Sequence, residues 1–138
     1  GDPGMPAAVP GGLMQSFEVP GRFPSLNDYL RIRNPRQRAA LKRELDHRVA
    51  WAAKEAGVRP VKRFMVRVVW FEPNARRDWD NVRSGIKFVL DGLKKAGIIE
   101  DDSQRYLLDT DDGYGHDKSN PHILVQIYEE GDPTWRKR

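Results

Sequence analysis

The sequence contains no cysteine, so disulfide bonds and thiolate metal ligands are excluded. No apolar run approaches the roughly 18 residues that a membrane-spanning helix needs. The first residues also lack the charged, apolar and small-residue pattern of a secretory signal. Histidines are few, and His47, His116 and His122 have no paired spacing typical of a zinc site, so each is expected at the surface. From these absences we expect a soluble, cytoplasmic protein with no membrane partner.

The 138 residues suit one domain with a single core, because 38% of them are hydrophobic and 32% are charged. We expect a disordered N-terminal tail over 1–15, which is rich in glycine, proline and alanine. One domain is expected over 16–130. A flexible C-terminal tail is expected over 131–138.

Positive charge is concentrated between residues 22 and 77, whereas acidic residues cluster between 100 and 117. Lysine and arginine together number 24, against 20 aspartates and glutamates, and the isoelectric point is about 9.5. A basic body around an acidic region is compatible with a polyanionic partner such as nucleic acid, without requiring one.

The apolar periodicity indicates an α+β fold, a single domain with a small mixed β-sheet packed with two main helices. Helical spacing covers 35–56 and 81–96, and a glycine follows each segment as a stop. Dense β-branched and aromatic residues predict a central strand over 64–71. Further strands are expected at 16–19, 106–108 and 122–128.

Two polar segments are expected to be loops. Residues 23–31 predict a loop entering a turn, and 109–121 a hairpin loop that does not fit the spacing of a calcium-binding loop. Trp51 and Trp70 lie in apolar patterns and are expected in the core. Trp79 either stacks on a base or packs beneath a site, and packing is the commoner outcome.

The stretch RRDWDN at 76–81 contains two aspartates, Asp78 and Asp80, that are separated by one residue. Like charges at this spacing repel each other, so we expect a cation between them. The alternative is an N-cap pair, since an aspartate before a helix accepts backbone N–H bonds. Asp101 and Asp102 further along favour metal binding, although these two acids taken alone are better explained by a solvated turn.

Three carboxylates with a nearby lysine are what a Mg²⁺-dependent phosphodiester nuclease requires. Magnesium prefers oxygen ligands and keeps some of its waters, which leaves room for a phosphate and a nucleophilic water. Asp78 and Asp80 supply two ligands, and Asp101 or Asp102 is a candidate for the third.

Lys87 and Asp91 follow Asp80 by seven and eleven positions, which brings all three within about 20° of one azimuth on a regular helix. Lys87 has two interpretations. It either balances the charge that develops on a phosphoryl group, or it forms an i,i+4 ion pair with Asp91 on an exposed face. Asp91 is expected to have a structural or supporting role.

Three consecutive motifs, RRDWDN, KFVLDGLKKAG and EDDSQ, resemble the RusA family of Holliday junction resolvases, which are phage- and prophage-associated endonucleases. Pro24, Ser25 and Asn27 look like the N-terminal motif of that family, and the likeness extends over about 17–128. The resemblance implies an α+β fold, a homodimer, Mg²⁺ or Mn²⁺, and paired symmetric nicks in a four-way DNA junction.

The resemblance also implies roles for individual residues. Asp78, Asp80 and Asp102 would be the metal-binding and catalytic acids, with Asp101 beside them and Lys87 as the catalytic lysine. The chain departs from the family pattern at VRSGI, 82–86, which places Lys87 about three residues later than usual. These residues either add nearly one helical turn or bulge before the helix.

Basic residues near both motifs are candidates for DNA contacts. In the segment 31–43 they either solvate a helix face or contact phosphates, and a DNA-cutting centre downstream favours phosphate contacts. The expected DNA-binding residues are Asn27, Arg31, Arg36, Arg38, Arg43, Arg76 and Arg77.

The sequence therefore predicts a Mg²⁺-dependent, structure-selective DNA endonuclease that resolves Holliday junctions during recombination and repair. An alternative is a branched-DNA-binding protein without catalytic activity, which the displaced Lys87 motivates. A third is an unrelated metal-dependent nuclease that acts on flaps or single strands.

Overall fold

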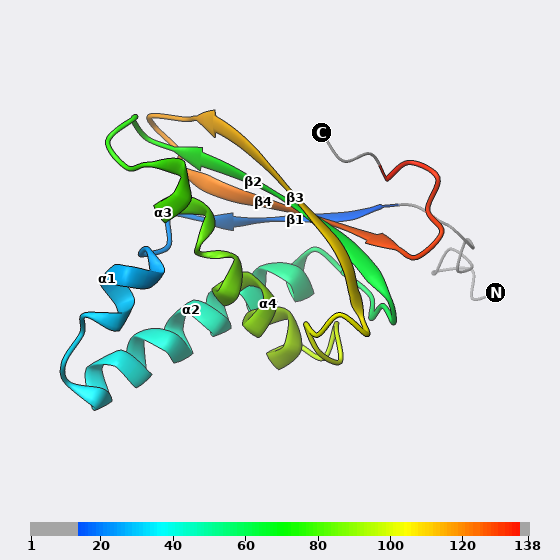
Figure 1. The fold of residues 1–138 in the computed structure, drawn as a ribbon, viewed down its shortest axis with the longest axis horizontal. Coiled ribbons are helices and arrows are strands. Elements are labelled where there is room, and N and C mark those ends of the chain that lie inside the picture. The colour runs from blue at the N-terminus through cyan, green and yellow to red at the C-terminus, as the bar shows by residue number, and fades with distance from the viewer. Residues whose placement is uncertain (1–13, 136–138) are drawn as a thin grey trace.

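The computed structural model describes residues 14–135, and nearly all of the expected N-terminal tail, 1–15, lies outside this range. The fold is a small single-domain α+β structure in which a four-stranded mixed sheet carries its helices on one side (Figure 1). In chain order the elements are β1 Gln15–Pro20, α1 Leu26–Leu30, α2 Pro35–Glu55, β2 Phe64–Glu72, α3 Trp79–Arg83, α4 Ile86–Lys95, β3 Leu107–His116 and β4 His122–Glu129.

The strands lie in the order β1-β4-β2-β3, so the predicted central strand, β2, is inside the sheet. It pairs antiparallel with β4 and parallel with β3, and β4 pairs antiparallel with β1. The parallel pair requires a crossover, which α3 and α4 provide between β2 and β3. The end of β2 and the start of α3 therefore lie at one end of the sheet (Figure 1).

The prediction of a hairpin loop over 109–121 was wrong for 109–116, because β3 is a ten-residue edge strand that continues to His116. Two of its acidic residues, Asp111 and Asp112, find partners on the central strand. Asp111 forms an ion pair with Arg67 at 3.2 Å, and the Trp70 indole N–H donates to Asp112 at 3.0 Å. A local pattern of polar residues does not reveal these long-range partners, which make an acidic strand compatible with a sheet.

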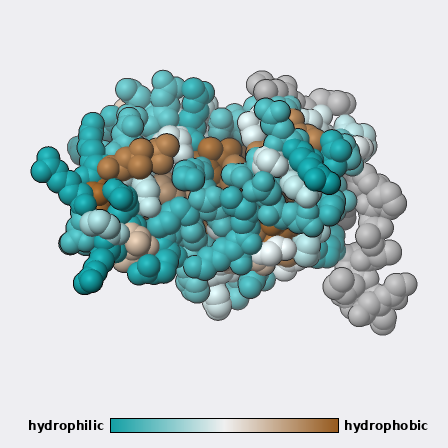
Figure 2. Space-filling view, turned by 60° about the horizontal axis from the view of Figure 1, so that its bottom comes forward, coloured by the Kyte–Doolittle hydropathy of each residue, from teal (hydrophilic) through white to brown (hydrophobic). Residues whose placement is uncertain are grey.

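The core lies between the sheet and the two long helices. Trp70 is 2% exposed, which confirms its predicted burial, whereas Trp51 is 62% exposed and its prediction was wrong. Leu45 and Val49 form the buried stripe of α2. Trp51 follows Val49 by two residues and therefore points about 200° away from it around the helix. The surface over the helices is mostly hydrophilic, with separate small hydrophobic patches (Figure 2).

Close contact between α2 and α4 depends on Gly92. A Cβ atom at this position would overlap the Cβ of Val49 and would lie 3.0 Å from the carbonyl oxygen of Asp46. Beside this contact, Lys42 of α2 lies 2.9 Å from Asp91 of α4 and 2.6 Å from Asp46. The two helices are thus joined by both packing and a partly buried ion-pair network.

The predicted helix over 81–96 is interrupted. Its first part is α3, its second part is α4, and Ser84 and Gly85 separate them. The Ser84 hydroxyl accepts from the Leu26 N–H at 2.9 Å and donates to the Asn81 carbonyl at 2.6 Å. The departure from the family pattern, 82–86, spans this break, so the helix does not simply continue for another turn.

Residues 23–31, predicted as a loop, contain the short helix α1. Ser25 is its N-cap, and its hydroxyl accepts from the Asp28 N–H at 3.0 Å. Only 4% of Ser25 is exposed, so this cap lies in a packed environment. A single turn of helix is held by its cap and its neighbours rather than by periodicity, which is why the sequence pattern did not indicate it.

At the other end, the packed region extends past residue 130. Trp135 contacts the Tyr128 ring at 5.0 Å and donates from its indole N–H to Asp109 at 3.2 Å. Among the histidines, His47 and His116 are exposed as predicted, while His122 is partly buried and stacks on Phe71 at 4.4 Å. Within 14–135, no helix combines the length and apolar character needed to cross a membrane.

Candidate nucleic-acid interface

Two segments that are about fifty residues apart in the sequence meet beside α1 and α3. They surround a hollow of about 210 Å³, which we call the polar pocket. It is lined by Ser25, Asn27, Asp28, Arg31, Arg76, Arg77, Asp78 and Asn81. The N-terminal motif and the RRDWDN motif, which were linked only by resemblance in the sequence, therefore form one site.

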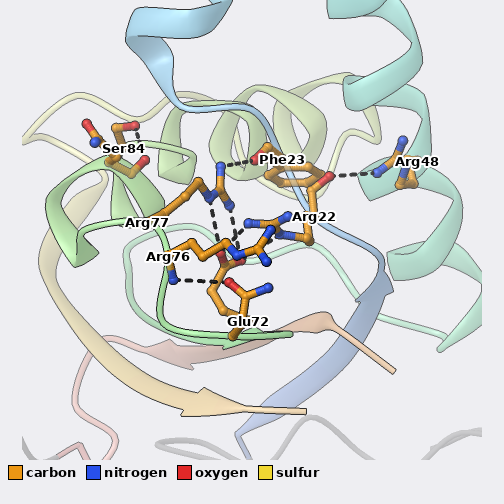
Figure 3. A network of polar contacts seen from close by, with 9 residues as sticks. Arg22, Phe23, Arg48, Glu72, Arg76, Arg77 and Ser84 are labelled. Atoms are coloured by element: carbon orange, nitrogen blue, oxygen red, sulfur yellow. Dashed lines mark hydrogen bonds and ion pairs between the residues drawn. The ribbon is translucent and has the colours of Figure 1, made fainter. Parts of the chain in front are cut away.

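A buried carboxylate holds one wall of the polar pocket in place (Figure 3). Glu72, at the end of β2, is 4% exposed and accepts two hydrogen bonds from Arg77, each 3.0 Å long. It also accepts from Arg22, at 2.7 and 3.2 Å. The remaining Arg77 nitrogen donates to the Phe23 carbonyl at 2.9 Å. These bonds join the β1–α1 connection to the β2–α3 connection.

The charge of this network is stable near neutral pH. Burial by itself would raise the pKa of the Glu72 carboxyl, but hydrogen bonds from Arg22 and Arg77 outweigh burial and hold the pKa below its ordinary value. The hydrogen bond to Glu72 raises the pKa of Arg22. Arg77 is therefore oriented by an anion that stays ionised, rather than free to follow a ligand.

The structure divides the predicted DNA-binding residues into two groups. Asn27, Arg31, Arg76 and Arg77 lie together at the polar pocket. Arg36, Arg38 and Arg43 belong to α2 and are absent from that lining. Arg36 and Arg43 are exposed, whereas Arg38 donates to the Ile32 carbonyl at 3.0 Å.

Asp78, which lines the polar pocket, and Asp80 are both exposed. Asp78 occupies the N-cap position of α3, yet its side chain makes no capping hydrogen bond. Asp80 lies 3.1 Å from Arg83, and 84% of its side chain is exposed. Side-chain capping therefore does not account for this acidic pair.

The other two predicted acids lie near the opposite end of α4. Lys94, in its last turn, is 3.3 Å from Asp102 and 3.8 Å from Asp101. The ten residues of α4 span roughly 15 Å. Asp102 lies beside the last turn of this helix, whereas α3 precedes its first turn (Figure 1).

Within residues 14–135, no group of three acidic or histidine side chains is placed so that it could hold a metal ion. The structure does not bring Asp78, Asp80, Asp101 and Asp102 into such a group within these residues, and their binding of Mg²⁺ or Mn²⁺ stays a prediction.

Lys87 forms the ion pair that its alternative interpretation predicts. Its ammonium group is 3.3 Å from Asp91, which also contacts Lys42 and Lys94. Burial would raise the pKa of Asp91, but the hydrogen bond and charge of Lys42, with Lys94 and Lys87, lower it. Asp91 therefore has the structural role expected of it, as the centre of a network between α2 and α4.

An aromatic cluster, which the sequence did not predict, lies beside the acidic pair. The Trp79 ring is 4.5 Å from that of Tyr114 and 5.6 Å from that of His116, centroid to centroid. Trp79 also packs against the core, as expected for it. Tyr114 and His116 were missed because they belong to β3, where a loop was predicted; a period-two pattern on an edge strand was the only available signal.

Comparison with protein-family models and with curated proteins found no match for this chain. The likeness to RusA resolvases therefore depends on the motifs themselves. Two of these motifs, the N-terminal motif and RRDWDN, lie together in the structure, because both contribute residues to the lining of the polar pocket.

Proposed function

We propose that this protein is a structure-selective DNA endonuclease that resolves Holliday junctions by paired, symmetric phosphodiester hydrolysis during recombination and repair. The observation that carries the proposal is the convergence of the N-terminal motif and RRDWDN on the polar pocket. The pocket presents guanidinium and amide donors next to two exposed carboxylates. This combination suits a phosphodiester held beside acidic groups.

Phosphate binding is the step that the side chains support most directly. Arg76 is exposed, and 78% of the Arg31 side chain is exposed, so both guanidinium groups are accessible to a strand. Arg77 is fixed by Glu72 and contributes a preorganised cation. Arginine suits this role because its planar donors match phosphate oxygens in pairs.

Hydrolysis is assigned to the acidic pair. Asp78 lines the polar pocket and is the carboxylate nearest in sequence to its arginines. The proposal includes a requirement for Mg²⁺ or Mn²⁺, because the resemblance to RusA resolvases implies one. Because one chain does not bring the predicted ligands together, that requirement needs a direct test.

A homodimer is also part of the proposal, since two symmetric cuts require two active sites related by a two-fold axis. Light scattering at assay concentration is expected to give twice the monomer mass. A monomer that still makes paired cuts would contradict this part.

A branched-DNA-binding protein without catalytic activity is the second candidate. Two observations favour it: Lys87 is paired with Asp91, and Asp101 and Asp102 are separated from the acidic pair. A protein of this kind would keep the polar pocket and lack the complete catalytic set.

A synthetic four-way junction tests both candidates. Binding is measured by gel shift in EDTA, and nicking is measured on denaturing gels with Mg²⁺, with Mn²⁺ and with EDTA. Paired nicks that require a divalent cation support the endonuclease, and binding without nicks supports the second candidate. A duplex of the same sequence is the control for structure selectivity. Failure to bind the junction would exclude both.

A further inference from the structure

The aromatic cluster, defined as Trp79, Tyr114 and His116, is accessible rather than buried. Tyr114 is 41% exposed and His116 is also exposed, both on the edge strand β3. Trp79 supports them from α3, with its ring tilted by 31° to that of Tyr114. Single exposed aromatic residues are common, but three rings in contact beside a basic pocket form an organised surface.

The cluster borders a second hollow that adjoins the polar pocket. This hollow, which we call the aromatic pocket, has a volume of about 210 Å³ and is lined by Ala75, Arg77, Asp78, Trp79 and His116. Arg77 and Asp78 line both pockets. The two therefore lie side by side. Guanidinium and amide groups make up most of the polar pocket's lining, and the rings of Trp79 and His116 form part of the aromatic pocket's lining.

Arg83 adds a cation at the edge of the cluster. It lies 3.1 Å from Asp80, and its side-chain hydrogen bond with Tyr114 is the main reason that the pKa of Arg83 is raised. The Tyr114 ring is therefore packed on one side against Trp79, and the positive charge of Arg83 lies close to it. A ring restrained in this way loses little conformational entropy when a flat ligand stacks on it.

From this arrangement we infer that the aromatic cluster binds an unpaired nucleobase of DNA, while a phosphate of the same strand occupies the polar pocket. Paired pockets of these two kinds match the two parts of a nucleotide, since rings stack on bases and guanidinium groups bind phosphates. The inference rests on the proposed function and extends it. A base in an intact duplex has both faces covered, so the preferred substrate contains an unpaired nucleotide at the branch.

Fluorescence anisotropy with a short single-stranded DNA tests the inference, and the same strand with one abasic position tests the contribution of the base. Tyr114→Ala is expected to weaken single-strand binding about 5- to 150-fold, the range for removal of one stacked base. His116→Ala is expected to weaken it less. Tyr114→Phe keeps the ring and is expected to stay within about twofold of wild type. Trp51→Ala removes an exposed ring on α2 and should leave binding unchanged.

A 2-aminopurine base in the strand gives a second readout, because its fluorescence is quenched when it stacks. Quenching by wild type and by Tyr114→Phe, but not by Tyr114→Ala, supports the inference. Wild-type affinity and quenching in Tyr114→Ala would overturn it, as would equal losses in Tyr114→Ala and Trp51→Ala.

The proposed endonuclease is tested separately by junction nicking. If wild type nicks junctions and Tyr114→Ala keeps full single-strand binding, the stacking surface is refuted but the endonuclease proposal is not. If wild type quenches 2-aminopurine but does not nick junctions, the endonuclease proposal is refuted but the stacking surface is not.

Discussion

The Arg77 guanidinium and the Glu72 carboxylate form a two-pronged ion pair, with both N–O distances at 3.0 Å, and Glu72 is 4% exposed. Arg77 lines both the polar and the aromatic pockets. The position of the candidate site therefore depends on a carboxylate that lies beneath it at the end of the central strand.

Glu72→Gln is expected to lower the free energy of unfolding by about 1–3 kcal/mol, because two arginines lose their anionic partner. The decrease is smaller than for a fully buried pair, since the side chains of Arg22 and Arg77 are 36% and 21% exposed. Urea denaturation measures the change. Glu44→Gln, which breaks an exposed pair with Arg48, is the control and should change stability by less than about 0.5 kcal/mol.

The same pair predicts a dependence of stability on pH. The pKa of Glu72 is lower in the folded chain than its ordinary value of about 4.3. Its stabilising contribution is therefore complete above that value and is lost as the pH falls through the folded pKa. Unfolding free energies measured from pH 6 down to pH 3 should fall less steeply in Glu72→Gln than in wild type. Equal slopes would show that Glu72 contributes no proton linkage.

Asp80→Asn is expected to reduce junction nicking by about 100-fold or more, because it removes a carboxylate without changing its shape. Its melting temperature should stay close to that of wild type, since 84% of the Asp80 side chain is exposed. Junction binding should persist or tighten, because one charge that repels phosphate is removed. Glu130→Gln, an exposed acid paired with Arg63, is the control. Near wild-type nicking by Asp80→Asn would remove the acidic pair from the mechanism.

Arg31→Ala and Arg76→Ala are each expected to weaken junction binding and to reduce its salt dependence, by a slope of about one for each phosphate that the protein no longer neutralises. Replacing Arg36, Arg38 and Arg43 together tests whether α2 also binds DNA, and a reduced slope is expected there too. Arg63→Ala, an exposed arginine paired with Glu130, is the control. An unchanged slope for the α2 variant would reassign those residues to a solvated helix face.

Gly92→Ala is expected to destabilise the protein by about 1–3 kcal/mol, since the new methyl group would overlap Val49 of α2. In an exposed helix the same substitution would stabilise by up to about 1 kcal/mol, so the sign of the change is diagnostic. Chemical denaturation measures it. Increased stability would mean that α2 and α4 separate without any energetic penalty.

Most elements with a strong local pattern could be predicted from the sequence. The helix over 35–56 agrees with α2, and the strands over 64–71 and 122–128 agree with β2 and β4. Gly57 and Gly97 follow the helical segments with φ angles of +72° and +74°, as expected for glycine stops. These features depend on residues close together in the chain, and burial on one face imposes a period that is readable locally.

The candidate site was only partly predictable. Asn27, Arg31, Arg76 and Arg77 were predicted to bind DNA, and the structure places them at one pocket. Their convergence depends on the Phe23 carbonyl and on Glu72, and no predicted motif includes Glu72. Grouping of the four acids was a further expectation. It is absent from residues 14–135, where Asp78 and Asp80 lie at the start of α3 and Asp101 and Asp102 lie beside the last turn of α4.

The sequence by itself determined the amphipathic elements, the basic character and the residues of the motifs, because each follows from composition or short-range spacing. The tertiary structure alone decided that β3 continues as far as His116, that Trp51 is exposed and that Tyr114 meets Trp79. The reason is physical. Arg67 and Trp70 provide the partners that allow an acidic segment to pair with the central strand, and they lie about forty residues away from it along the chain.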